Sequence, residues 1–127
     1  MLRVFLVVLI CFSFASTINA RDPLDTDADK YKILLENERI RVLEYRDRPG
    51  EKTLQHQHPA FVLYAMSSFK RKLILPDGKT LMREFNIGDV MWSDAQTHIG
   101  ENIGLTETHV IIVELKQSPM EKTRTKQ

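Results

Sequence analysis

Residues 50–58 of this chain read GEKTLQHQH, and this stretch decides the fold that we predict. Five residues separate Gly50 from His56, and a single residue separates His56 from His58. Side chains two positions apart on a β-strand point to the same face of the sheet. The imidazoles of His56 and His58 can therefore converge on one point, as the ligands of a single metal ion must.

A second stretch, residues 88–102, reads GDVMWSDAQTHIGEN and carries a further histidine, His98. Three of the four histidines of the chain fall in these two stretches. We predict that the stretches meet on neighbouring strands and that His56, His58 and His98 bind one divalent metal ion. The alternative is that these histidines are solvated turn residues, because a His-x-His pair by itself fits both interpretations.

The rest of the chain favours β-structure, because short runs rich in branched residues alternate with turn signals and no sustained helical period appears. The expected strands are residues 31–36, 40–46, 53–58, 60–66, 69–75, 80–87, 90–92 and 108–115. Many short strands at close spacing are typical of a β-sandwich or closed barrel. We predict a single all-β domain over residues 31–116.

Residues 1–20 have the layout of a secretory signal peptide. Arg3 supplies a positive start, residues 4–14 form an apolar run too short to span a bilayer, and Ala20 is a small residue suited to cleavage. We expect an exported chain, periplasmic or secreted, that begins at Arg21; an uncleaved membrane anchor is the alternative. Residues 21–30 are expected to be a polar, solvated arm, and residues 117–127 a polar tail.

Composition limits the kinds of partner that the protein is expected to have. Cys11 is the only cysteine, so an exported chain without residues 1–20 forms no disulfide. Loss of Arg3 would reduce the basic residues from 18 to 17, equal to the 17 acidic ones. No basic stripe stands out, which argues against nucleic acid as a partner. A core of this size gains from association, and we expect a homodimer in which the arm and the 31–36 strand lie on the partner.

The two histidine stretches resemble the paired motifs of the cupin superfamily. The first family motif is a glycine, five residues, His-x-His and then a glutamate, and the second ends in a histidine, three residues and an asparagine. The nearer resemblance is to small, single-domain RmlC-like cupins, in which the turn LPDGK, here residues 75–79, also recurs. The resemblance covers residues 31–116 and implies a cupin-type jelly-roll β-barrel, with dimerisation common among such proteins.

The chain departs from the family pattern at several positions. The family glutamate would fall at Val62 or Leu63, and neither side chain can bind a metal. Asp94 and Gln96 stand where the second motif has proline and glycine, and the loop to His98 is one residue shorter than usual. The resemblance therefore transfers three histidines and no carboxylate. Imidazole suits several metals, so iron, zinc, nickel, copper and manganese all stay open.

Other residues are candidates for supporting roles. Asp94 is either a metal ligand or a partner that orients a histidine, unless it only forms a turn. Asn102 is expected to stabilise a turn beside the site, and His109 to be structural or solvated. Arg71 and Arg83 either point into the barrel and hold a carboxylate substrate or lie at a barrel mouth or dimer edge. The larger apolar side chains are expected to pack the barrel wall: Phe61, Tyr64, Met66, Met91 and Trp92.

Two functions from different classes fit these residues. The first is a metal-dependent enzyme acting on a small organic molecule. A three-histidine site without a carboxylate resembles that of thiol dioxygenases, whereas other cupins are isomerases or lyases, so the fold does not define the reaction. The second is a non-catalytic periplasmic protein that binds or senses a metal or small ligand, which the absence of an obvious acid–base pair favours.

Overall fold

The computed structural model of this chain describes residues 21–117, which form one short helix and nine strands. The predicted signal peptide lies outside the described residues, as does all of the predicted tail except Gln117. The elements are α1 (Pro23–Thr26), β1 (Tyr31–Glu36), β2 (Ile40–Asp47), β3 (His56–His58), β4 (Phe61–Ala65), β5 (Phe69–Ile74), β6 (Thr80–Phe85), β7 (Val90–Ser93), β8 (Gln96–Asn102) and β9 (Thr108–Leu115).

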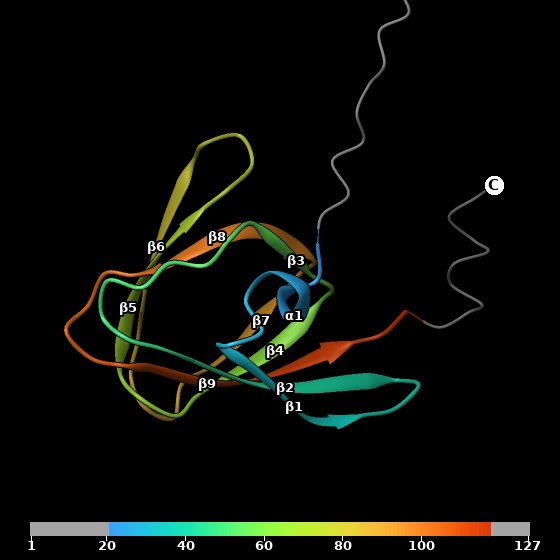
Figure 1. Cartoon of the computed structure of the whole chain (residues 1–127). Coiled ribbons are helices and arrows are strands. Elements are labelled where there is room, and N and C mark those ends of the chain that lie inside the picture. The colour runs from blue at the N-terminus through green and yellow to red at the C-terminus, as the bar shows by residue number, and fades with distance from the viewer. Residues whose placement is uncertain (1–20, 118–127) are drawn as a thin grey trace, which may run out of the picture.

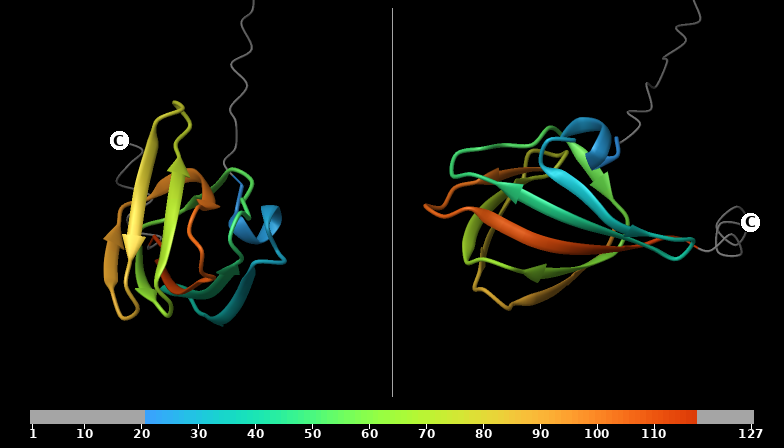
Figure 2. Two further views of the ribbon diagram at one scale, coloured as in Figure 1. Left: turned by 90° about the vertical axis from the view of Figure 1, so that its left-hand side faces the viewer. Right: turned by 60° about the horizontal axis from the view of Figure 1, so that its bottom comes forward.

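Two antiparallel sheets curve around a common interior (Figure 1). The five-stranded sheet has the order β1-β2-β9-β4-β7, and the four-stranded sheet has the order β3-β8-β5-β6. The two sheets enclose the core between them, while the β5–β6 hairpin extends beyond the body of the barrel (Figure 2). The predicted all-β fold in a single domain is confirmed.

Alternation along the strands creates the interior. In β9, Thr108, Val110, Ile112 and Glu114 are buried, and the residues between them face outward. Most of the core is formed by the side chains at the corresponding inward positions of neighbouring strands. The buried apolar residues are Tyr31, Leu43, Tyr45, Phe61, Ala65, Phe69, Phe85, Val110 and Ile112.

The glycine that begins each histidine stretch is needed by the backbone. Gly50 has φ of 84° and Gly88 has φ of 90°, in the left-handed region that side chains other than glycine rarely adopt. The Gly50 N–H also donates a hydrogen bond to the carbonyl of Asn102, 2.9 Å away. This bond ties the beginning of the first stretch to the end of the second.

The structure differs from the sequence-based expectation in two elements. Residues 96–102, for which no strand bounds were predicted, form strand β8, which pairs with both β3 and β5 and so places His98 on a strand next to that of His56. The expected solvated arm instead contains helix α1, in which Asp22 caps the first turn and Pro23 is buried. Asp27 is 5% exposed and accepts a hydrogen bond from the backbone N–H of Leu54. A polar side chain such as Asp27 can be buried here because its carboxylate oxygens accept a hydrogen bond from a backbone N–H group of the barrel.

The expectation that five apolar side chains pack the barrel wall is partly wrong. Phe61 is buried and Met91 packs against the core. Tyr64, Met66 and Trp92 are 44%, 41% and 56% exposed. Tyr64 and Trp92 have the outward parity of β4 and β7, because Leu63 and Met91 beside them face the interior. No helix within residues 21–117 is long and apolar enough to cross a bilayer.

Candidate metal centre

Strands β3 and β8 bring the three predicted histidines together. His56 and His58 share the inward face of β3, and His98 lies directly opposite His56 in the antiparallel pairing. The exposed fractions of the three side chains are small, 0% for His56, 2% for His58 and 8% for His98. One ring nitrogen from each of them lies within 4.8 Å of the others. The alternative of solvated turn residues is therefore wrong for all three.

The outer nitrogen of each ring is held by an acceptor. Nδ1 of His56 lies 2.9 Å from the carbonyl of Leu54, and Nδ1 of His58 lies 2.6 Å from Oε1 of Glu114. Nδ1 of His98 lies 3.0 Å from Oε1 of Gln96. Because these oxygens accept, each Nδ1 donates its proton outward and each Nε2 carries its lone pair inward.

This arrangement fits a metal ion. Nε2 of His56 and Nε2 of His58 are 3.1 Å apart. Two inward lone pairs at this distance repel each other unless a cation or a proton lies between them. A metal bound at ~2.0–2.1 Å from each nitrogen would hold two such nitrogens about 3 Å apart, which agrees with the observed distance.

The electrostatics of the site keep the rings available as ligands. Burial, with the neighbouring ring of His58, lowers the pKa of His56 to about 4. Burial, with the rings of His56 and His58, lowers the pKa of His98 to about 2. Both rings are therefore neutral near pH 7, and a neutral imidazole is the form that binds metals.

Glu114 on β9 supplies a carboxylate that sequence analysis missed. It is 1% exposed, accepts from His58, and is bonded at 2.7 Å by Nε of Arg41, which also binds Asp22. Burial alone would raise the pKa of Glu114, but the hydrogen bonds from His58 and Arg41 outweigh it and hold the pKa below the usual value. The only sequence signal for Glu114 was one acidic residue at an inward position of an apolar strand.

Tyr31 is the second residue that sequence analysis did not assign to the site. Its hydroxyl lies 3.3 Å from Nε2 of His56, on the side where the lone pairs converge. The ring packs against Tyr45, with 4.6 Å between centroids. Burial raises the pKa of Tyr31 well above its ordinary value, so the side chain is a neutral phenol that can donate a hydrogen bond.

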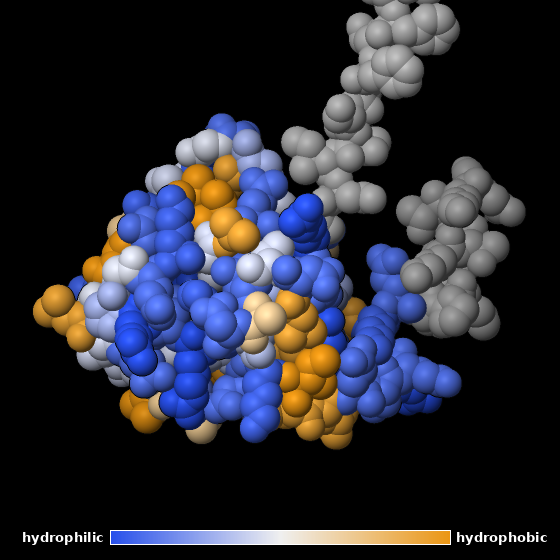
Figure 3. Space-filling view, viewed as in Figure 1, coloured by the Kyte–Doolittle hydropathy of each residue, from blue (hydrophilic) through white to orange (hydrophobic). Residues whose placement is uncertain are grey.

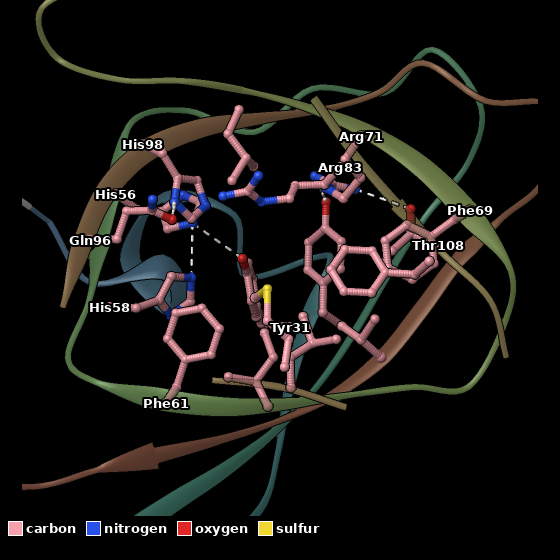
Figure 4. A pocket seen from close by; sticks show the side chains of 17 residues that line it. Tyr31, His56, His58, Phe61, Phe69, Arg71, Arg83, Gln96, His98 and Thr108 are labelled. Atoms are coloured by element: carbon pink, nitrogen blue, oxygen red, sulfur yellow. Dashed lines mark hydrogen bonds between the residues drawn. The ribbon is translucent and has the colours of Figure 1, made fainter. Parts of the chain in front are cut away.

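A cavity opens beside the histidines (Figure 4). Apolar side chains from both sheets form most of its wall. His56, His58 and His98 belong to its lining. The cavity therefore places a ligand within reach of the three imidazoles.

Arg71 points into the barrel. Its Nη1 bonds Asp47 at 2.5 Å and Thr108 at 3.1 Å, and its Nη2 lies 3.1 Å from the hydroxyl of Tyr45. Gly100 on the adjacent strand makes room for it, since a Cβ there would lie 2.5 Å from Nη2. Of the alternatives for this residue, the interior position is the one observed, and its charge is paired with Asp47.

The other candidate residues lie elsewhere. Arg83 also lines the cavity but is exposed at its mouth. Asp94 is exposed and accepts a hydrogen bond from Nε1 of Trp92 at 3.2 Å, away from the histidines, as the turn interpretation expected. Asn102 is buried and bonds Asp47 and the carbonyl of Thr106, so it holds a turn. His109 bonds Glu44 at 2.8 Å on the outward face of β9.

Several solved structures share this fold. A cupin domain from Bordetella pertussis Tohama I superimposes with a TM-score of 0.63 and 26% identity, over 68% of this chain and 92% of that one. The protein has the cupin fold. An RmlC-like cupin with a double-stranded β-helix fold from Methanocaldococcus jannaschii matches at a TM-score of 0.55 and 15% identity, over 75% and 84% of the two chains.

Comparison does not extend this identification to an activity. The polyketide cyclase RemF from Streptomyces resistomycificus matches at a TM-score of 0.51 and 18% identity, over 76% of this chain and 78% of RemF, which is a likeness of fold. No protein-family sequence model and no curated protein sequence matches the chain. The function of this protein must therefore be argued from its own residues.

Proposed function

We propose that this protein is a metal-dependent enzyme that acts on a small organic molecule, with one divalent metal ion bound by His56, His58 and His98. The observation that carries the proposal is the shared orientation of the three rings. Each Nδ1 is held by an oxygen acceptor on the outer side, and the Nε2 atoms of His56 and His58 approach to 3.1 Å on the inner side.

The donor set is three neutral imidazoles. A divalent ion held in this way keeps its charge and has open coordination positions, so it supplies Lewis acidity or lowers the pKa of a bound water. Imidazole donors suit iron, zinc, nickel and copper, and manganese is not excluded.

Within the protein, Tyr31 is the group best placed to donate a hydrogen bond to a bound molecule. Its neutral hydroxyl lies 3.3 Å from Nε2 of His56, close to where a bound molecule would meet the histidines. A phenol in this position donates a hydrogen bond to a substrate oxygen and stabilises negative charge that develops there. The apolar cavity wall excludes water from the same point.

The metal proposal is tested by elemental analysis of protein purified without a histidine tag. We expect close to one divalent metal per chain, and strong loss of metal in each of the variants His56→Ala, His58→Ala and His98→Ala. His109→Ala is the matched control, because this histidine bonds Glu44 outside the barrel. Undiminished metal content in all three site variants would show that these residues are not the ligands.

A non-catalytic ligand-binding or sensing role is the second candidate. The described residues that line the cavity include no aspartate, glutamate, lysine or cysteine, and burial raises the pKa of both Tyr31 and Tyr45 above the ordinary value. Metal-loaded protein should be incubated with small organic molecules while oxygen and products are measured. Oxygen uptake supports a dioxygenase-like enzyme, conversion without oxygen supports an isomerase or lyase, and tight binding without conversion supports the second candidate.

We also propose that the protein is exported to the periplasm or secreted, after cleavage following Ala20. Such cleavage would keep the contacts of the arm, because the carbonyl of Arg21 accepts a hydrogen bond from Gln57 and Asp22 binds Arg41. Intact mass of protein from the cell envelope or medium is expected to match a chain that begins at Arg21. A mass that still includes residues 1–20 would instead indicate an uncleaved anchor.

A further inference from the structure

Two cations and no anion line the cavity. Arg71 on β5 and Arg83 on β6 are direct partners in the antiparallel register, and both side chains line the cavity. Like charges that face each other across two strands repel. Within residues 21–117, the cavity lining contains no aspartate or glutamate. The charge that faces a bound molecule therefore depends on how each arginine is neutralised by residues behind it.

Arg71 is neutralised by the protein itself. Asp47, which is 3% exposed, pairs with its guanidinium, and Thr108 and Tyr45 take further hydrogen bonds. Asp47 is fixed in turn by the side-chain amide of Asn102 at 3.0 Å. A buried ion pair with its hydrogen bonds satisfied leaves little charge for a ligand.

Arg83 differs from Arg71 in both respects. Within the described part of the chain it makes no ion pair, and its side chain is exposed at the cavity mouth. In the view of Figure 4, Arg83 reaches across the cavity toward the end where the histidines lie, whereas Arg71 bonds Thr108 at the opposite end. One positive charge is therefore directed at the cavity space.

The wall of the cavity is mostly apolar. Six side chains from both sheets supply much of it: Phe61, Leu63, Phe85, Met91, Val110 and Ile112. Such a surface favours contact with hydrocarbon and offers few hydrogen-bond partners for a strongly polar molecule such as a sugar.

We propose that the molecule bound in this cavity is a small organic carboxylate, with Arg83 as its anion-binding residue. The guanidinium holds the carboxylate through paired charge-assisted hydrogen bonds, and the apolar wall contacts the hydrocarbon body. The opposite end of the molecule then lies at His56, His58 and His98. The inference deepens the proposed function and rests on it, since the reacting end is assigned to the metal site.

The test compares acids with neutral amides of the same shape. The probes are benzoate, phenylacetate and hexanoate, each paired with its carboxamide, and binding to zinc-loaded protein is measured by calorimetry and ligand-observed NMR. We expect at least one acid to bind more tightly than its amide, by roughly tenfold to hundredfold. Failure of all three acids to bind at millimolar concentration, or equal binding of acid and amide in every pair, would overturn the inference.

Substitutions then assign the preference to one residue. Arg83→Gln should remove the preference for the acid, and Arg83→Lys should retain part of it, because a lysine keeps the charge but not the paired geometry. Lys79→Gln is the matched control, since it removes the same charge from the β5–β6 turn without touching the cavity. An acid preference that persists unchanged in Arg83→Gln would mean that the carboxylate is held elsewhere, and the inference would fail.

Metal content is measured in the same samples, so the two proposals can fail separately. Arg83 is not among the histidine ligands, and Arg83→Gln should bind as much zinc as the unchanged protein. Normal zinc binding without any Arg83-dependent acid preference overturns the inference and leaves the metal proposal standing. Absence of zinc binding in the unchanged protein overturns the metal proposal instead.

Discussion

At the scale of single residues, Glu114 sets the orientation of His58. Its carboxylate accepts the Nδ1 proton of His58 at 2.6 Å, so Nε2 faces the other two histidines. Carboxylates in this relation fix the tautomer of a ligand histidine and increase its basicity. The position expected for the family glutamate is occupied by apolar residues, and Leu63 lines the cavity there. Glu114 thus acts through His58 and not as a ligand.

We predict that Glu114→Gln weakens metal binding by roughly 10- to 100-fold, because the amide keeps the shape but loses the charge that supports His58. Zinc affinity measured by competition with a chromophoric chelator is the direct assay.

Glu44→Gln is the matched control for this prediction. Glu44 forms the same kind of carboxylate–histidine pair with His109, but on the outer face of the barrel. Equal zinc affinity of Glu114→Gln and Glu44→Gln would contradict the role of Glu114.

At the scale of elements, helix α1 and the residues after it pin the segment that leads into β3. Asp27 accepts from the backbone N–H of Leu54, and the carbonyl of Leu54 in turn accepts from Nδ1 of His56. The carbonyl of Arg21 accepts from the N–H of Gln57 in β3 itself. The arm therefore helps to hold the strand that carries two of the three histidines.

We predict that Asp27→Ala lowers the free energy of unfolding by about 1–3 kcal/mol, because it leaves a partly buried backbone N–H without its acceptor. Urea unfolding followed by fluorescence gives the value. Asp25→Ala removes a carboxylate from an exposed position of the same arm and should change stability little. A similar loss in both variants would point to net charge and not to the Asp27 contact.

At the scale of the whole molecule, the outward face of the five-stranded sheet carries a row of apolar residues beside a row that includes Lys32 and Glu44. The register of the strands aligns one row of apolar side chains across the sheet: Leu35, Val42, Val113, Val62 and Trp92. The second row also contains Tyr64 and Val90, and apolar surface is visible where β1 and β2 lie (Figure 3). Contiguous apolar surface of this kind marks an interaction site.

We propose that two copies of the chain pair through this face, and we predict a homodimer by light scattering at micromolar concentration. The arm packs on its own barrel, so we assign the interface to the sheet and not to the arm. Trp92→Glu should yield monomers, because it would bury a charge in the interface. Leu105→Glu changes a residue that is 97% exposed in the β8–β9 loop and should leave the dimer intact. A monomeric unchanged protein would refute the proposal.

Acid should destabilise the metal-free protein through its buried histidines. The pKa is about 4 for His56 and about 2 for His98 in the fold, whereas histidine in an unfolded chain titrates near ~6.5. The unfolded state then takes up protons first as the pH falls. We predict that the free energy of unfolding is highest above about pH 6.5 and decreases between about pH 6.5 and pH 4.

Urea midpoints measured across that range with a chelator present give the slope. A His56→Gln and His98→Gln double variant should show a flatter dependence on pH, and an equal slope would contradict the prediction. Added metal should stabilise the unchanged protein near neutral pH and lose this effect in acid, because protons compete for the ring nitrogens.

The sequence by itself determined the features that depend on local spacing. The His-x-His pair shares a face because side chains alternate along a strand, and Gly50 and Gly88 mark turns because only glycine adopts their backbone angles easily. Strands β1 and β9 were predicted with the bounds that the structure has, and the other predicted strands were recognised from short runs of branched or apolar residues between turn signals. A strand carrying His98 was expected beside that of His56, but the bounds of β8 were not predicted, because His98 to Asn102 contains polar residues and Gly100 at positions that a buried strand usually fills with apolar ones.

Only the tertiary structure decided which distant residues join the site. Glu114 and Tyr31 reach the histidines because β9 and β1 lie in the opposite sheet, and no spacing within the chain reports a contact across the barrel. Arg71 and Arg83 look equivalent in the sequence, since both have inward parity on adjacent strands. Asp47 makes them different: it lies behind Arg71 and neutralises it, while Arg83 remains at the mouth. Charge pairing depends on distances of a few ångströms in the fold, which the order of residues does not encode locally.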